Sequence, residues 1–347
     1  MTSRERIECA FECGTPDRVP VSPFTLGHLG PDDDFTWQFI RAVDALISPG
    51  IGGGSPVLGT ALQAESRQEG DATIITYHTP GGDLRSVLRR TAQTTGHVEF
   101  PCRTPDDVEK LLAIPYEPPD PDPAEFFRWR ERVGDEGLVL AGMGTAICWA
   151  ADMFSPEDFC LLWADAPDAL IEMTRVGNER LREWVDRACR KGVDAFRLVG
   201  GEYASTQLGP RAFDVLCREP DKQIVDIMRE HGAWAYYHNH GPIMRYLDMM
   251  LDIGMHALDP LEAPPWGDCD LRAAKDKLRG KVCIVGNLDD MEVIEKRDVE
   301  EVKRIGREVV EQAGPDGLCL GGTASGTYTE KGARGFMALV EVVTEQA

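Results

Sequence analysis

The chain has 347 residues, a formal net charge of −22 at pH 7 and a hydrophobic share of 42%. This length and composition allow a sizeable core, and we expect one elaborated domain over residues 1–347. The negative charge repels phosphate backbones and anionic headgroups, and no apolar run reaches the roughly 18 residues that span a bilayer. We therefore expect neither a nucleic-acid partner nor a membrane. The N-terminus lacks the features of a signal peptide, which favours a cytoplasmic location.

The ten cysteines are scattered along the chain without CxxC spacing. This pattern argues against a disulfide framework and against a structural zinc site of four thiolates. Most of the thiols are expected to be small buried hydrophobic groups.

Residues 1–136 predict an N-terminal elaboration. A capped amphipathic helix opens the chain, and a short apolar strand is expected at 19–24. A β-hairpin is predicted around residues 72–93, because two glycines separate two strand-like segments. Residues 117–125, "EPPDPDPAE", read as a linker that is rich in proline and acid.

Residues 137–347 alternate between apolar strands and amphipathic helices. Strands are predicted at 138–142, 194–200, 233–238, 256–261, 282–287 and 316–320. Helices are predicted near 156–163, 167–191, 210–231, 241–253, 270–279, 297–313 and 331–345. This alternation indicates βαβ units and a parallel sheet, either doubly wound or closed as a (β/α)8 TIM barrel. Since neither a GxGxxG nor a P-loop motif is present, the barrel fits better.

The segment "YYHNHG" ends one predicted strand with His238 and His240. Residues two apart on an extended strand point to the same face, so both imidazoles can approach one atom. A third ligand would complete a divalent metal site, and Glu202, Asp259, Glu262 or Cys319 could reach it from neighbouring strands. Alternatively, the histidines hydrogen-bond to substrate or backbone without a metal.

Other strand ends carry further candidates. Glu202, Asp259 and Glu262 are candidate acid–base groups, although each could instead cap or stabilise a turn. Asn287 could orient a substrate, whereas Asp289 or Asp290 is better explained as the cap of the next helix. The last glycine-rich loop offers hydroxyl groups for substrate binding, and Trp266 could wall the pocket. The hydroxyl candidates are Thr323, Ser325, Thr327 and Tyr328.

Three stretches resemble the uroporphyrinogen decarboxylase superfamily, which includes zinc-dependent methylcobamide:coenzyme M methyltransferases. They are "RERIECAFECGTPDRVPV", the segment from "LGPRAF" to "YYHNHG", and "VCIVGNLDD" with the later "GPDGLCLGGTAS". The resemblance covers essentially the whole chain, is strongest from about 190 to 345, and implies a (β/α)8 barrel. Dimers are common in the family, so a homodimer is expected.

Two departures from the family pattern bear on the substrate. Where the decarboxylase carries an arginine-rich signature, this chain has "SPFTLGHLGPDDDF", which would repel a polycarboxylate. The methyltransferases bind zinc through HxC and a later cysteine. These positions match His238, His240 and the neighbourhood of Thr323, which implies a harder site of nitrogen and oxygen ligands for zinc or another divalent ion.

The resemblance therefore implies methyl transfer between a small substrate and a corrinoid cofactor or protein. We expect a metal held by His238 and His240, with Glu202 as the candidate third ligand. Asp259 or Glu262 would shuttle a proton. One alternative is a metal-free decarboxylase-like lyase acting on a carboxylated aromatic or tetrapyrrole-like substrate. A second alternative is a non-catalytic protein that binds a tetrapyrrole.

Overall fold

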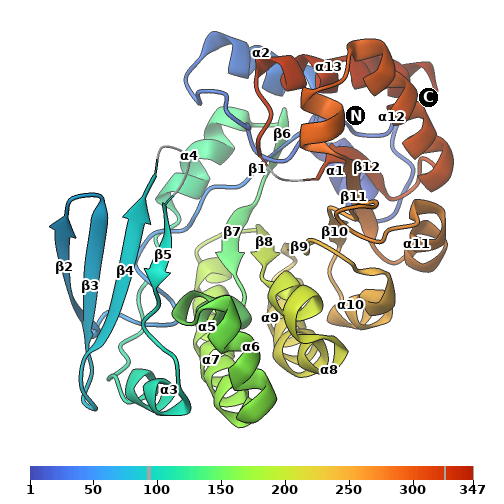
Figure 1. Cartoon of the computed structure of the whole chain (residues 1–347). Coiled ribbons are helices and arrows are strands. Elements are labelled where there is room, and N and C mark those ends of the chain that lie inside the picture. The colour runs from blue at the N-terminus through green and yellow to red at the C-terminus, as the bar shows by residue number, and fades with distance from the viewer. Residues whose placement is uncertain (92–94, 324–325, 347) are drawn as a thin grey trace.

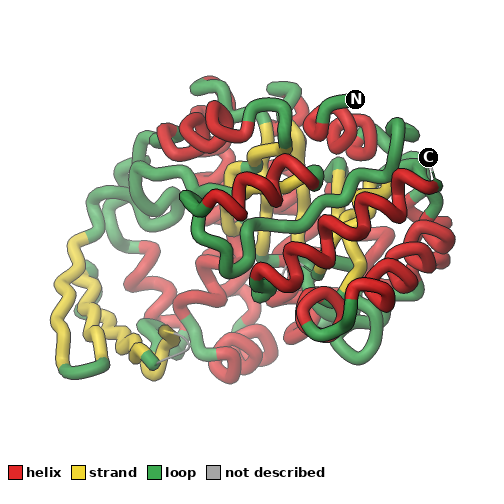
Figure 2. The backbone as a smooth tube through the Cα atoms, turned by 90° about the horizontal axis from the view of Figure 1, so that it is seen from above, coloured by secondary structure: helices red, strands yellow, loops and turns green. Residues whose placement is uncertain are grey.

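The computed structural model describes residues 1–91, 95–323 and 326–346. Figures 1 and 2 show parallel strands near the middle of the molecule, helices around them, and both chain ends on the same side. Among the described residues, no helix has the length and apolar character required to cross a membrane.

Six parallel strands form the central sheet and confirm the predicted strand–helix alternation. Their order is β7-β8-β9-β10-β11-β12, so each strand lies beside its successor in the chain. The strands are β7 (Ala141–Gly144), β8 (Ala195–Val199), β9 (Trp234–His238), β10 (Ala257–Asp259), β11 (Cys283–Leu288) and β12 (Leu318–Gly322). Parallel pairing brings the carboxyl ends of all six strands to one edge, where a functional site is expected.

Helices follow these strands and cover the outside of the sheet (Figure 2). They are α5 (Ala146–Met153), α6 (Pro156–Asp165), α7 (Pro167–Arg190), α8 (Pro210–Phe213), α9 (Glu219–Glu230), α10 (Leu247–Ile253), α11 (Leu271–Leu278), α12 (Val299–Ala313) and α13 (Glu330–Glu345). The helix predicted at 210–231 is interrupted, because a π-helical turn, η2 (Asp214–Arg218), separates α8 from α9. Irregular turns also occur at η1 (Tyr203–Leu208), η3 (Met244–Tyr246) and η4 (Asp290–Glu295).

The N-terminal part adds α1 (Ser3–Phe11), α2 (Asp34–Ala42) and a parallel pair of β1 (Ala45–Ile47) and β6 (Gly137–Val139). The predicted strand at 19–24 forms isolated bridges. The Ser22 amide donates to the Leu320 carbonyl at 2.8 Å, and the Thr25 amide donates to the Leu46 carbonyl at 2.9 Å. Beyond β1, the Gly142 amide donates to the carbonyl of residue 49 at 2.9 Å. Residues 20–25 therefore lie between β12 and β1, and β1 leads on to β7.

A four-stranded antiparallel sheet stands away from the parallel strands (Figure 1). It comprises β2 (Gln63–Glu69), β3 (Ala72–His78), β4 (Leu84–Arg90) and β5 (Thr95–Glu99). The predicted hairpin is confirmed as β3–β4, whereas β2 and β5 extend it beyond the prediction. The helices α3 (Pro105–Leu112) and α4 (Ala124–Val133) follow, and α4 begins inside the predicted linker.

Inward-facing side chains of the parallel strands, such as Tyr236, form a compact apolar cluster with Phe11 of α1 and Phe24 of the bridging segment. Other members are Leu138, Leu140, Ala195, Ala257, Val285 and Cys319. Because strand side chains alternate, the next inward positions beyond this cluster lie nearer the carboxyl ends. Polar groups occupy these positions, including His238 on β9 and Asp259 on β10, which are paired in register.

Candidate active site

His238 and Asp259 form a buried imidazole–carboxylate pair at the ends of β9 and β10. The ring Nδ1 lies 3.0 Å from both carboxylate oxygens of Asp259. A carboxylate accepts hydrogen bonds, so Nδ1 carries the proton and donates it. This hydrogen bond leaves Nε2 free to face the site and fixes the orientation of the ring.

His240 and Glu262 form a second pair in the loops that follow the same two strands. His240 Nδ1 lies 3.0 Å from Glu262 Oε1, and the Gly241 amide donates to Glu262 Oε2 at 2.7 Å. Burial opposes the charged ring of His240, but its hydrogen bond to Glu262 and the surrounding negative charges outweigh burial and raise its pKa. Burial also disfavours the charged form of Glu262, yet the hydrogen bonds from His240 and Gly241 lower its pKa. An ionised pair is therefore favoured.

The two imidazole rings are adjacent. Their centroids are 4.4 Å apart and their planes are nearly perpendicular, at 89°. The alternation argument expected both rings on one face of a strand, whereas β9 ends at His238 and His240 reaches its neighbour from the following loop. Asn239 supports the turn between them, since its Nδ2 donates to the Ser205 hydroxyl at 3.0 Å and to the His240 carbonyl at 2.8 Å.

Glu202 lies at the carboxyl end of β8, where its Oε2 accepts from the Gly200 amide at 3.2 Å. Its charge contributes to the raised pKa of His240. Within the described ranges, however, no three His, Cys, Asp or Glu side chains are grouped so that they could hold a metal ion. The described residues thus offer a pair of nitrogen donors but not the three-ligand set of His238, His240 and Glu202. Metal binding there stays a prediction.

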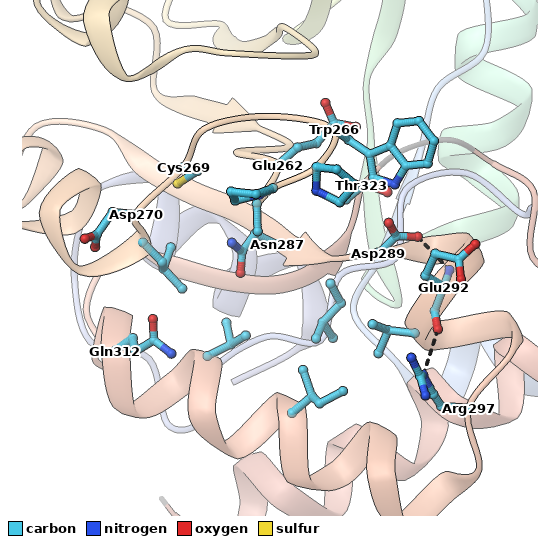
Figure 3. A pocket seen from close by; sticks show the side chains of 18 residues that line it. Glu262, Trp266, Cys269, Asp270, Asn287, Asp289, Glu292, Arg297, Gln312 and Thr323 are labelled. Atoms are coloured by element: carbon cyan, nitrogen blue, oxygen red, sulfur yellow. Dashed lines mark hydrogen bonds between the residues drawn. The ribbon is translucent and has the colours of Figure 1, made fainter.

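A cavity of about 840 Å³ opens beside the second pair, and Glu262 lines it. Figure 3 shows the loop that carries Trp266 on one side and α12 on the other. This volume suits a small organic ligand. Its charged lining is mainly acidic, with one guanidinium, from Arg297, among Glu262, Asp270, Asp289 and Glu292. Such a lining disfavours a polyanionic ligand.

Three predicted substrate-binding residues meet in this cavity: Trp266, Asn287 and Thr323. Trp266 is 61% exposed. Asn287 Nδ2 donates to the Leu261 carbonyl at 3.2 Å and so ties β11 to the loop after β10. The Thr323 hydroxyl accepts from the Asp290 amide at 3.3 Å.

The other predicted residues have different positions. Tyr328 is fully buried, its hydroxyl donates to the Thr25 carbonyl at 2.6 Å, and it is not among the residues that line the cavity. Ser325 lies outside the described residues. Asp289 caps η4, as the capping interpretation predicted, because its Oδ1 accepts from the amides of Met291 and Glu292.

Sequence reasoning missed Arg197 and Asp268. Arg197 is an inward-facing position of β8, one strand away from the histidines, and a lone charge inside an apolar strand was the available signal. Asp268 Oδ1 accepts from the amides of Ile243 and Met244 at 2.7 and 3.0 Å, which holds the turn after His240 against the loop that carries Trp266.

The family model of uroporphyrinogen decarboxylase (URO-D) matches residues 79–346, more than half of the chain. The chain belongs to the URO-D family. This membership confirms the resemblance noted in the sequence. The comparison with curated proteins finds no significant match.

A methyltransferase from Methanosarcina mazei has a similar structure, with a TM-score of 0.67 and 15% identity over 100% of this chain and 99% of that one. A B12-independent methionine synthase from Shewanella sp. W3-18-1 aligns over 76% of this chain and 72% of that one, with 9% identity and a TM-score of 0.49. At such identities the first likeness establishes a shared fold, and the second is too weak to support an argument.

Proposed function

We propose that this chain is an enzyme that delivers a proton from its paired imidazoles to a small substrate as a methyl group leaves that substrate. The observation that carries the proposal is the pair of imidazole–carboxylate units, His238–Asp259 and His240–Glu262, whose rings lie 4.4 Å apart. Hydrogen-bonded units of this kind are typical of general acid–base catalysis.

The barrel is part of the same proposal. The bridges of Val21 to β12 and of Phe24 to β1, with the bridge from Gly50 to Gly142, support a closed ring of eight parallel strands. The two imidazole–carboxylate units would then lie at the carboxyl end of a (β/α)8 barrel. Barrel enzymes place their catalytic groups at this end.

The roles of the two units follow from their surroundings. Glu262 stabilises the charged form of His240, so His240 is suited to donate a proton from Nε2. When the bond between the methyl group and a substrate oxygen or nitrogen breaks, its electron pair stays on that heteroatom, which then takes up the proton. Asp259 keeps His238 in the tautomer whose Nε2 can accept a proton. His238 is therefore suited to take a proton from solvent and pass it to His240 after each turnover. A corrinoid on a partner protein would supply the nucleophile that accepts the methyl group.

The proposed reaction assigns no catalytic step to a divalent metal. The thiolates of the HxC pattern are absent, and the described His, Cys, Asp and Glu residues group no three potential ligands. Zinc binding by His238 and His240 remains open to elemental analysis of untagged protein.

The test is a comparison of matched histidine variants in an assay that supplies methyl ethers and methylamines with a reduced corrinoid. His238→Gln and His240→Gln should each lower kcat/KM by roughly 100- to 10,000-fold. The control is His78→Gln, because His78 Nδ1 also lies 2.9 Å from a carboxylate oxygen, Asp83 Oδ1, but on the outlying sheet. Wild-type turnover in His240→Gln would refute the proposal.

A second candidate is a carboxy-lyase, because the same imidazoles could protonate the carbanion that forms when CO2 leaves. Release of CO2 from an aromatic or pyrrolic acid, undiminished by a strong chelator, would select it. Tight tetrapyrrole binding without turnover would instead favour a binding protein, although the acidic cavity lining disfavours a carboxylated tetrapyrrole.

A further inference from the structure

Arg197 lies on β8 in register with Tyr236 of β9. Its guanidinium carbon is 3.8 Å from the centre of the Phe24 ring, and both aromatic residues belong to the apolar cluster among the inward faces of the strands. The guanidinium therefore points inward. Its Nε is buried without a hydrogen-bond partner among the described residues, while the residue as a whole is half-buried.

Tyr236 presents a second group without a close partner at this place. Its side chain is fully buried, and its hydroxyl forms no hydrogen bond of 3.5 Å or less with a described residue. Burial raises the pKa of Tyr236 well above the usual range. The charge of Asp259 and a weak, long hydrogen bond to its carboxylate act in the same direction, and the charge of Arg197 acts against them. Both charges are therefore close enough to act on the hydroxyl.

Donors that are buried without acceptors cost free energy unless a ligand supplies the acceptors. A carboxylate fits this place, because a guanidinium donates two parallel hydrogen bonds to its oxygens and a neighbouring hydroxyl can add a third. The carboxylate of Asp259, two strands away on β10, is already engaged by His238. Arg197 thus retains its charge for an incoming anion.

We infer that Arg197 and Tyr236 bind a carboxylate group of the substrate inside the ring of strands. Tyr236 and His238 are two residues apart on one face of β9, a rise of about 6.6 Å. That spacing is roughly the span of a six-membered ring with its substituents. The inference rests on the proposed function in one respect. The substrate would be a small carboxylic acid, and the atom that receives the proton would lie at the end opposite its carboxylate.

The experiment compares benzoate with its uncharged analogue benzamide in ligand-observed NMR titrations. Wild-type protein should bind benzoate at least tenfold more tightly than benzamide. Arg197→Gln should abolish this preference, and Arg197→Lys should retain part of it, because an ammonium keeps the charge but not the planar fork. The control is Arg128→Gln, which removes the same charge from a side chain that is 72% exposed and should leave both affinities unchanged.

Equal affinities for the two probes, or no detectable benzoate binding, would overturn the inference. So would an Arg197→Gln protein with a native circular dichroism spectrum that still prefers benzoate. If Arg197→Gln does not fold, Tyr236→Phe decides the matter: it keeps the buried ring, and it should weaken benzoate several-fold without changing benzamide. His240→Gln separates the two proposals, since it should lose turnover while keeping the preference for benzoate.

Discussion

His240 and Glu262 come from loops after neighbouring strands and meet through a 3.0 Å hydrogen bond, while the other carboxylate oxygen of Glu262 holds the Gly241 amide. One side chain therefore fixes both the imidazole and the backbone that follows it. The charge of this pair, rather than its shape, controls the protonation of His240.

Glu262→Gln tests the charge while preserving the size of the side chain. Because Glu262 raises the pKa of His240, the variant should lower that pKa, so His240 loses its proton at a lower pH. The alkaline limb of the kcat/KM profile should move in the same direction, since the protonated ring is the donor. An NMR titration of the imidazole signals gives a readout independent of turnover. The signals of His78 serve as the internal control, and an unchanged titration of His240 would contradict the assignment.

Asp221 makes stability depend on pH. This buried carboxyl accepts from the Tyr237 hydroxyl at 2.6 Å, and burial raises its pKa to about 7. Between its unfolded pKa, about 4, and about 7, the folded chain holds a proton that the unfolded chain has lost. The free energy of unfolding should therefore decrease as pH rises through this window.

Asp221→Asn should flatten that dependence, which urea unfolding at pH 5 and pH 8 would measure. The control, Asp248→Asn, alters a carboxylate that is 79% exposed and should keep the wild-type difference. A variant of Asp221 with the full wild-type dependence would show that other groups cause it.

Asp44 anchors the N-terminal part to the parallel strands. It is completely buried and accepts from Arg6 Nη1 at 2.7 Å, from Arg18 Nη1 at 2.6 Å and from the Val21 amide at 2.9 Å. Asp44→Asn leaves Arg18 without this balancing carboxylate and leaves Arg6 with only its ion pair to Asp17, and it should reduce the free energy of unfolding by about 3–5 kcal/mol. Chemical denaturation measures the loss. Asp32→Asn alters a carboxylate that is 84% exposed and paired with Arg132, and it should cost about 1 kcal/mol or less.

Trp266 is expected to serve the ligand rather than the fold, because most of its side chain is exposed at the cavity. Trp266→Ala should change the free energy of unfolding by about 0.5 kcal/mol or less, yet raise KM about tenfold through the loss of apolar contact. Leu161→Ala removes another exposed apolar side chain, 52% exposed on α6, and should leave KM unchanged. A similar KM in both variants would assign ligand binding elsewhere.

The sequence predicted the parallel strands well, because apolar runs and helix caps are local signals. Strand alternation led us to expect that His238 and His240 are adjacent, and their rings are in contact although His240 lies just beyond the end of β9. Their carboxylate partners could not be derived, since the pairing of His238 with Asp259 depends on the register between β9 and β10. The sequence interpretation offered both carboxylates as acid–base groups, metal ligands or turn residues, whereas each is hydrogen-bonded to an imidazole.

The helices of the first half of the chain were not predicted from the sequence for a different reason. The helices α2, α3, α4 and α5 have 8 to 10 residues and lie among glycines and prolines, so their periodic signal is short. Tertiary contacts stabilise such segments more than their own propensity does. The inward position of Arg197 was hidden for a similar reason, because a single charge in an apolar strand does not show which face it occupies.

The outlying sheet has a consequence for how the protein behaves in concentrated solution. Every residue of its edge strand β2 is exposed, and three of them, Glu65, Arg67 and Glu69, are charged. An open strand edge can recruit a strand from another molecule, and charges along it discourage such addition. Replacing these residues by apolar ones would allow the edge strand β2 to pair with strands of other molecules and so nucleate fibrous aggregation.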